Sequence, residues 1–156
     1  MRSRIRRSTD RSLRAALAGS TAAAVWVAAE PAARRLLRTP YSDVRLLGAP
    51  ISRRHWRAVG TAVHLGNGAV AGILSDRLGV RGPRAAALLF QAENLAAWPL
   101  MAAVDRFHPD RRSGAWPRLL TNRRVFAQEA VLHLVFGAVL GRLLRHGELG
   151  RIDARR

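Results

Sequence analysis

Four apolar segments, each bounded by arginine-rich polar stretches, follow one another along the chain. They occupy residues 15–33, 58–74, 85–104 and 125–141. Each is about as long as the roughly 17–25 residues that a helix needs to cross a bilayer, and none shows a long strand-like alternation. No arginine lies in the central turns of any of them, whereas a soluble surface helix normally carries charges along one face. The pattern predicts four membrane helices rather than a soluble bundle.

A stretch of the second segment returns in the fourth. Residues 64–72 match residues 133–141 at an offset of 69, with six of the nine positions identical. Such self-similarity indicates duplication of a helix hairpin. We expect one repeat at 12–77 and the other at 83–146. The predicted fold is therefore an all-α, integral membrane four-helix bundle made of two repeated helix hairpins.

The whole chain, 1–156, is expected to form a single membrane domain. Its ends, 1–11 and 147–156, are basic and are predicted to be flexible tails. The connection 75–84 is short and turn-like, which predicts that the second and third helices are antiparallel neighbours. The two longer loops are amphipathic, and their aromatic side chains are expected to anchor the protein at the headgroup level. These anchors are Tyr41, Trp56 and Trp116.

The formal charge of +17 arises from 27 basic residues, all of them arginine, against ten acidic ones. The absence of lysine and the abundance of alanine indicate a GC-rich genome, which weakens the charge as evidence for a specific partner. The arginines mark the ends of the apolar segments, where they suit anionic lipid headgroups. A nucleic-acid-binding protein concentrates them on one face or arm, so the bilayer is the expected partner and nucleic acid is not. Cysteine is absent, which excludes disulfides and thiolate metal sites.

An even number of spans places both termini on one side of the membrane. The stretches on that side hold 14 arginines and those on the other side hold 13, so the positive-inside rule does not separate them. The terminal arms are the densest, which favours cytoplasmic termini in a multi-pass protein of the bacterial cell membrane. The basic start of the chain resembles a signal peptide, but Glu30 and Pro31 within the first apolar run favour a retained helix.

Two glycine faces accompany the repeat. Glycines spaced four apart lie on one face of a helix and let another backbone approach closely in lipid. The pattern therefore predicts close helix packing at Gly68 and Gly72, and again at Gly137 and Gly141. One arrangement is that the two faces meet each other around a pseudo-twofold axis.

A histidine lies one turn before each glycine face, near the middle of its span. A polar side chain at that depth is costly unless it faces the bundle interior and finds a partner. The candidate polar midplane cluster consists of His64, Asn67, Glu93, Asn94, Glu129 and His133. We expect His64, His133 and Glu93 to lie within reach of one another. A structural polar contact is the leading interpretation, a proton or ion relay through Glu93 the second, and haem or metal ligation through the two histidines the third.

Signals of enzymatic chemistry are missing. There is no glycine-rich phosphate loop and no nucleophile elbow, and no metal-binding spacing of diagnostic value. The run that contains Asp105, His108 and Asp110 is better explained by a salt-bridged turn than by a cation site. We therefore expect neither catalytic residues nor a bound cofactor or metal.

Several short motifs carry a resemblance. They are the Glu30-Pro31 span, the Tyr41-Ser42-Asp43-Val44 loop, the Trp98-Pro99 span, the run from Val104 to Pro109 and the two His-Leu-x-x-Gly motifs at His64 and His133. From about residue 15 onward the chain resembles small uncharacterised membrane proteins of GC-rich actinobacteria. The resemblance implies an integral membrane protein with four helices and implies no activity, substrate or catalytic residue.

Three classes of function follow from these features. A structural or accessory membrane protein is the leading hypothesis. The alternative is a small proton- or ion-coupled transporter or channel that uses His64, His133 and Glu93; because four short helices enclose little volume, it would need a homo-oligomer. The second alternative is a soluble, basic, helical nucleic-acid-binding bundle.

Overall fold

The computed structural model describes residues 2–153, and within 2–8 and 146–153 it describes the backbone alone. Every regular element in the described part of the chain is helical, which confirms the predicted all-α class. In chain order the elements are α1 (Arg2–Leu37), α2 (Asp43–Gly48), α3 (Trp56–Arg77), α4 (Pro83–Ala97), the 3-10 turn η1 (Trp98–Leu100), α5 (Met101–Phe107), α6 (Pro109–Arg112) and α7 (Arg123–Asp153). The predicted tails fall largely outside the residues whose side chains are described.

Four helical stretches in the described residues are long and apolar enough to cross a membrane. They are Thr9–Leu37, Trp56–Arg77, Pro83–Phe107 and Arg123–Arg145, and they contain the four apolar segments of the sequence. The shortest has 22 residues, about 33 Å at the helical rise, which matches the roughly 30 Å of a bilayer core. The prediction of four long apolar helices is thus confirmed.

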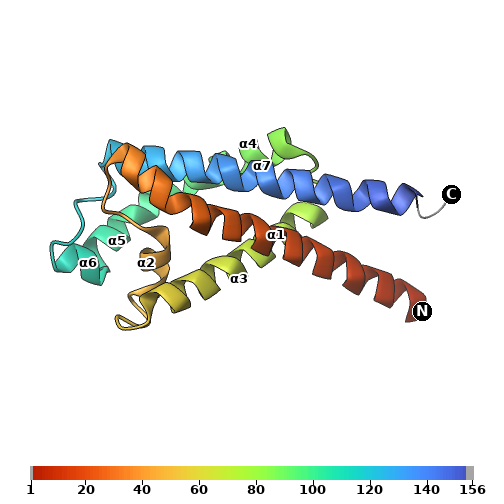
Figure 1. Ribbon diagram of the computed structural model, residues 1–156, viewed down its shortest axis with the longest axis horizontal. Coiled ribbons are helices and arrows are strands. Elements are labelled where there is room, and N and C mark those ends of the chain that lie inside the picture. Colours follow the sequence, from red (N-terminus) through yellow and green to blue (C-terminus); the bar gives the residue numbers. More distant parts are fainter. Residues whose placement is uncertain (1, 154–156) are drawn as a thin grey trace.

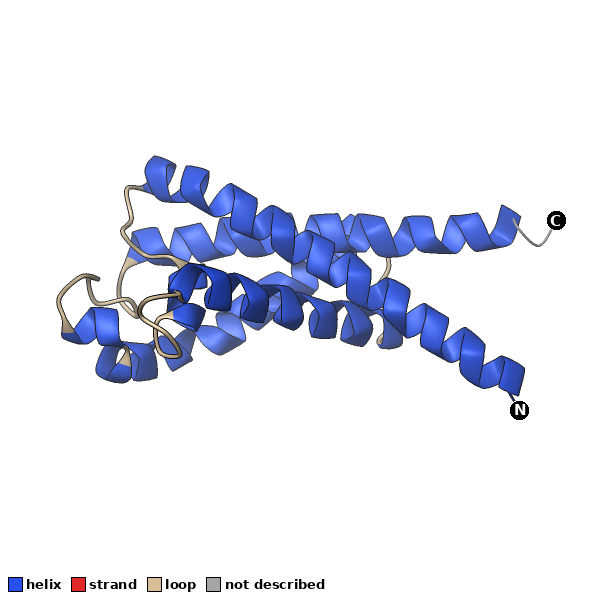
Figure 2. Cartoon of the chain, turned by 60° about the horizontal axis from the view of Figure 1, so that its bottom comes forward, coloured by secondary structure: helices blue, strands red, loops and turns tan. Residues whose placement is uncertain are grey.

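The long helices form two pairs joined along one seam. α1 packs against α3, α4 packs against α7, and α1 meets α7 between the pairs (Figure 1). The two ends of the chain lie at one end of the molecule, and α2, α5 and α6 lie at the other (Figure 2). α3 and α4 make few direct contacts, so the prediction that these consecutive helices pack as neighbours is wrong. The reason is that each already has its small-residue face covered by another helix.

On α3, the covered face is the glycine face. A methyl group placed on Gly68 would lie 2.6 Å from both the Cβ of Ala23 and the carbonyl oxygen of Gly19. One placed on Gly72 would overlap the carbonyl oxygen of Ala15. The backbones of α1 and α3 therefore touch along this face, and a side chain larger than hydrogen has no room there.

The glycine face of α7 packs against α4 in the same way. A methyl group on Gly137 would lie 2.6 Å from the Cα of Ala87, and one on Gly141 would overlap the carbonyl oxygen of Gly82. Each glycine face thus meets the first long helix of its own half of the chain. The two faces do not meet each other, which overturns that arrangement.

Two apolar clusters form the core. The larger fills the space between the long helices around Trp26, Phe90 and Phe136. The smaller lies at the loop end and includes Tyr41 and Trp116, which are 0% and 3% exposed. These two rings lie 5.1 Å apart and are packed inside, so they do not serve as interface anchors as the sequence had suggested.

Candidate functional site

A groove runs between α3 and α4, where these two helices fail to pack. Its volume is about 590 Å³. Trp26 of α1 and residues of α7 line its floor, and α2 contributes Asp43 and Leu47. Its walls are largely apolar, from Val70, Ala71, Leu74, Leu78, Leu89, Phe90 and Phe136. The polar lining residues are Asp43, His64, Asn67, Ser75, Glu93, Glu129 and His133. We call this space the α3–α4 groove.

His64 is paired with a carboxylate that the sequence analysis did not select. Its Nδ1 lies 2.9 Å from Oδ2 of Asp43, the first residue of α2. Ser42 caps α2 by accepting a hydrogen bond from a backbone N–H, and Glu30 of α1 accepts one from the N–H of Val44 at 3.4 Å. The bond to Glu30 holds the start of α2 against α1, and α2 packs on α3, which positions Asp43 beside His64.

His133 makes two contacts that constrain its protonation. Its Nδ1 lies 2.7 Å from the backbone carbonyl oxygen of Glu129 and must donate to it, because a carbonyl only accepts. Its Nε2 lies 3.1 Å from Oε2 of Glu93. Both ring nitrogens of His133 therefore have a polar neighbour in the protein. Glu93 is half-exposed, and both residues of the pair line the α3–α4 groove.

Trp26 separates the two histidines. The centroid of its indole lies 5.1 Å from the ring of His64 and 4.6 Å from that of His133. The structure brings His133 and Glu93 together but pairs His64 with Asp43, and the link between the two pairs is this ring contact. Both nitrogens of His133 have partners and an indole contacts both imidazoles, so the arrangement does not favour axial ligation of haem.

The remaining predicted polar residues occupy different positions. Glu129 lies at the groove floor with 3% of its surface exposed, and its Oε1 has no hydrogen-bond partner. The carboxyl groups of Asp43, Glu30 and Glu93 are close enough to interact electrostatically with that of Glu129. Asn67 lines the groove from an exposed position on α3. Asn94 is buried outside the groove, on the face of α4 that faces α7. Among the described residues, no three His, Asp or Glu side chains are grouped so as to hold a metal ion.

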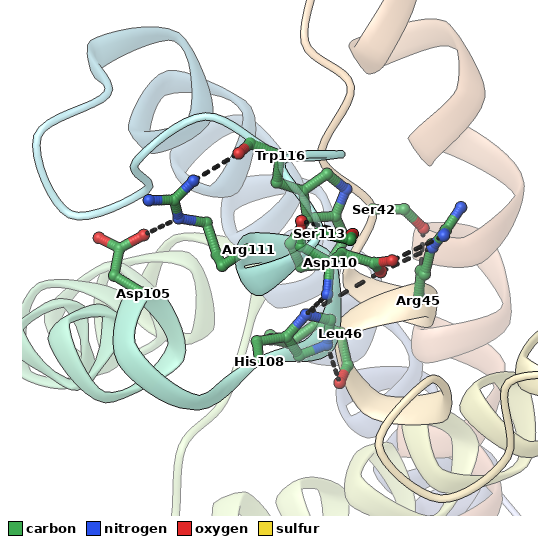
Figure 3. Close-up of polar contacts among 9 residues, drawn as sticks. All are labelled: Ser42, Arg45, Leu46, Asp105, His108, Asp110, Arg111, Ser113 and Trp116. Atoms are coloured by element: carbon green, nitrogen blue, oxygen red, sulfur yellow. Dashed lines mark hydrogen bonds and ion pairs between the residues drawn. The ribbon is translucent and has the colours of Figure 1, made fainter.

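A second polar network, the loop cluster, ties the two halves together at the loop end (Figure 3). It comprises Ser42, Arg45, Leu46, Asp105, His108, Asp110, Arg111, Ser113 and Trp116. The guanidinium group of Arg45 on α2 donates a hydrogen bond to each carboxylate oxygen of Asp110 on α6, both at 2.7 Å. Asp105 accepts hydrogen bonds from Arg111 and from the backbone N–H groups of Leu119 and Leu120. Both carboxylates are thus fully engaged in a salt-bridged turn.

Burial shifts the pKa of two groups at this end of the molecule. It lowers the pKa of His108 below its ordinary value near 6.5, against the opposing effect of Asp110. The ring is stacked on Trp116 at 4.5 Å, its Nδ1 accepts from the N–H of Asp110, and its Nε2 lies 3.3 Å from the carbonyl of Leu46. Burial also raises the pKa of Tyr41 well above its usual value, and the nearby charge of Glu129 acts in the same direction.

Sequence reasoning missed Asp43, Trp26 and Glu30 as parts of the site. Asp43 directly follows Ser42, and a serine before an acidic residue is a helix N-cap signal. That signal predicts the short α2, yet it does not tell that α2 turns back onto α3. Trp26 lies in an alanine-rich run, and in the sequence only the size of its side chain distinguishes it from its neighbours.

Comparison with known proteins yields no relative of this chain: no family model, no curated protein and no solved structure matches it.

Proposed function

We propose that this protein is a multi-pass integral membrane protein of the structural or accessory class, with its four long helices crossing the bilayer. The observation that carries the proposal is the distribution of side chains on these helices. At most 44% of the residues in the most apolar window of any span are buried inside the molecule, so most of this apolar surface faces outward. The titratable side chains near the middle of the spans line the α3–α4 groove, whereas the exposed arginines lie toward the helix ends. The groove-lining residues are His64, Glu93, Glu129 and His133. Lipid is the solvent that suits such a surface.

We further propose that the two halves arose by duplication of a helix pair. The contacts at the glycine faces support this. Gly68 meets Gly19 on the first long helix of its half, and Gly137 meets Ala87, which corresponds to Gly19 at an offset of 68. With two helices per unit, both units run in the same direction through the membrane. The arginines at the helix ends would bind anionic headgroups, and the termini would be cytoplasmic.

Membrane extraction tests the first proposal. We expect the protein to stay with membranes washed at high salt and in alkaline carbonate, and to leave them only with detergent. Release by carbonate would contradict four spans. A soluble nucleic-acid-binding bundle would be released by salt alone.

The topology can be tested in the same membranes, because the natural chain has no cysteine and single cysteines report without background. We expect Arg53→Cys, at the loop end, to react with an impermeant maleimide from outside the cell. Arg77→Cys, at the end of α3 near the termini, should react only after permeabilisation. Both are exposed arginines, so they form a matched pair.

A second candidate function is proton- or ion-coupled transport, and the contact of His133 with Glu93 at the groove favours it. Glu93→Gln removes a titratable partner from the groove while keeping the size of the side chain. If the protein carries protons, this variant should reduce pH-driven proton flux into proteoliposomes by at least tenfold, and Asp10→Asn, an exposed change outside the groove, should not. Equal flux in protein-free liposomes and in all three proteins would refute transport.

A further inference from the structure

The α3–α4 groove has the size and walls of a ligand site. Its volume of about 590 Å³ lies within the roughly 300–1,000 Å³ typical of small-molecule pockets, and its walls are mainly aliphatic and aromatic. It opens between two spans, since α3 and α4 do not cover each other. In the bilayer this opening would face the lipid, so a ligand would enter sideways with an apolar body.

Among the described residues, four buried polar atoms of the groove lining have no hydrogen-bond partner. Two are the hydroxyl of Ser75 and the indole N–H of Trp26, and the other two, Oε1 of Glu129 and Nε2 of His64, belong to titratable side chains. A carboxylate only accepts, so Nδ1 of His64 carries the hydrogen that faces Asp43, and Nε2 is an acceptor when the ring has no second proton. A buried carboxyl oxygen without a hydrogen-bond partner costs free energy. Both atoms can accept a hydrogen bond from a ligand, and the carboxyl group of Glu129 favours a donor that carries a positive charge.

The charge of the groove has the opposite sign to that of the protein. The chain carries +17, yet none of the arginines whose side chains are described lines the groove. Its lining holds three carboxyl groups, Asp43, Glu93 and Glu129, beside two imidazoles, and Glu30 adds a further negative charge close to Glu129. An anionic lipid headgroup would be repelled here, and a neutral acyl tail would leave both acceptors unpaired. A cation is the complementary partner.

We propose that the α3–α4 groove binds a lipophilic amine, a molecule with one protonated amine on an alkyl or aryl body. The amine donates to Glu129 and His64 near Trp26, and the apolar body lies between the walls of α3 and α4. The carboxylate of Glu129 lies at the floor and turns toward the amine on binding. The proposal rests on the membrane location proposed above, because the lateral opening is the route of entry.

Dodecylamine and dodecanol are suitable probes, because they share a chain and differ in the head group. We expect the intact protein in zwitterionic nanodiscs to bind dodecylamine with one saturable site above the partitioning seen in empty nanodiscs. Its affinity for dodecanol should be at least tenfold weaker, since the alcohol carries no charge. Equal affinity for both would overturn the proposal and indicate a site for an apolar tail alone.

Glu129→Gln tests the charge that the amine needs. This variant keeps the shape of the side chain, and we expect it to weaken dodecylamine binding by about 10–100-fold. Asp10→Asn removes a carboxylate from an exposed position outside the groove and should change the affinity by less than twofold. Unchanged binding in Glu129→Gln would overturn the assignment.

A pair of tryptophan variants keeps the test decisive if Glu129→Gln does not fold. Val70 lines the groove and is 56% exposed, so Val70→Trp should fill the opening and abolish dodecylamine binding. Leu88 is 71% exposed on α4 outside the groove, and Leu88→Trp should bind normally. Normal binding in both would overturn the proposal, as would cross-linking of two Val70→Cys protomers, which would show that a second copy covers the groove.

Failure of the membrane proposal would be visible separately. If carbonate releases the protein, the same titration is done in lipid-free buffer. Saturable, amine-selective binding that Glu129→Gln removes would then retain the groove assignment without the bilayer. If the protein stays in the membrane but binds dodecylamine and dodecanol equally, the groove assignment is refuted and the membrane proposal stands.

Discussion

At the scale of single residues, the hydrogen bonds of His108 determine which form of its ring the fold accepts. The Nδ1 accepts from the N–H of Asp110 at the start of α6, so it carries no proton. The Nε2 faces the carbonyl of Leu46 and supplies the donor. The ring is therefore neutral in the folded protein, in line with the lowering of its pKa by burial.

This neutral ring predicts a dependence of stability on pH. Below the ordinary pKa near 6.5 the unfolded chain binds a proton that the folded chain refuses, so the free energy of unfolding falls as the pH falls from about 6.5 toward the lowered folded pKa. In His108→Asn, which keeps an N-cap acceptor for α6, the drop in melting temperature between pH 7.5 and pH 5.5 should be smaller than in the natural protein. His55→Asn, at an exposed position, is the control and should leave that drop unchanged.

Residue-scale prediction from sequence succeeds where the partner is close in the chain and fails where it is distant. The spacing of Glu129 and His133 on one helix face indicates a contact, and the structure has one, although the backbone carbonyl of Glu129 makes it. Asp43 and His64 lie on different helices joined by a loop. No periodicity links them, because their meeting depends on how α2 folds back.

At the scale of elements, the glycine faces determine which helices pair. Gly68 and Gly72 remove side chains from one stripe of α3, and α1 offers the small residues Ala15, Gly19 and Ala23 to fill it. Van der Waals contact over such a close approach is the main attraction between helices in lipid. The sequence predicts that these stripes pack, but it does not predict their partners, since alanine is abundant on every helix.

Large side chains at these glycines should separate the helices. Gly68→Leu should destabilise the protein by about 1–3 kcal/mol or more, because the backbone of α1 leaves no space for it. Gly66→Leu is the matched control, as nothing lies within 4 Å of that position. Gly137→Leu and Ala138→Leu form the corresponding pair on α7. Thermal unfolding in detergent and elution from a sizing column would measure the difference, and equal tolerance within each pair would contradict close packing.

At the scale of the whole molecule, two helix pairs meet along α1 and α7 and are tied at the loop end. The Arg45–Asp110 ion pair joins α2 in the first half to α6 in the second, and it has both oxygens engaged. The sequence predicts the existence of two halves from the repeat. It does not predict their seam, because α1 and α7 are far apart in the chain and neither carries a signal for the other.

A double-mutant cycle should detect this tie. Arg45→Ala and Asp110→Ala should each destabilise the protein, and the double variant should lose about 1 kcal/mol less than the sum of the two, since Asp110 is buried while Arg45 is partly exposed. Denaturant titration in mixed micelles would give the three free energies. Strict additivity would show that the ion pair contributes nothing to joining the halves.

The tie at one end also gives the molecule a direction in which it can open. α1 and α7 cross each other, and their ends on the side of the termini lie apart (Figures 1 and 2). α7 has 31 residues and is about 46 Å long, so a rotation of about 5° at the tied end displaces its far end by about 4 Å. A small change in groove width near α2 and α6 would therefore produce a larger movement at the ends of the chain. A pair of probes attached there would report it as a change in the distance between them.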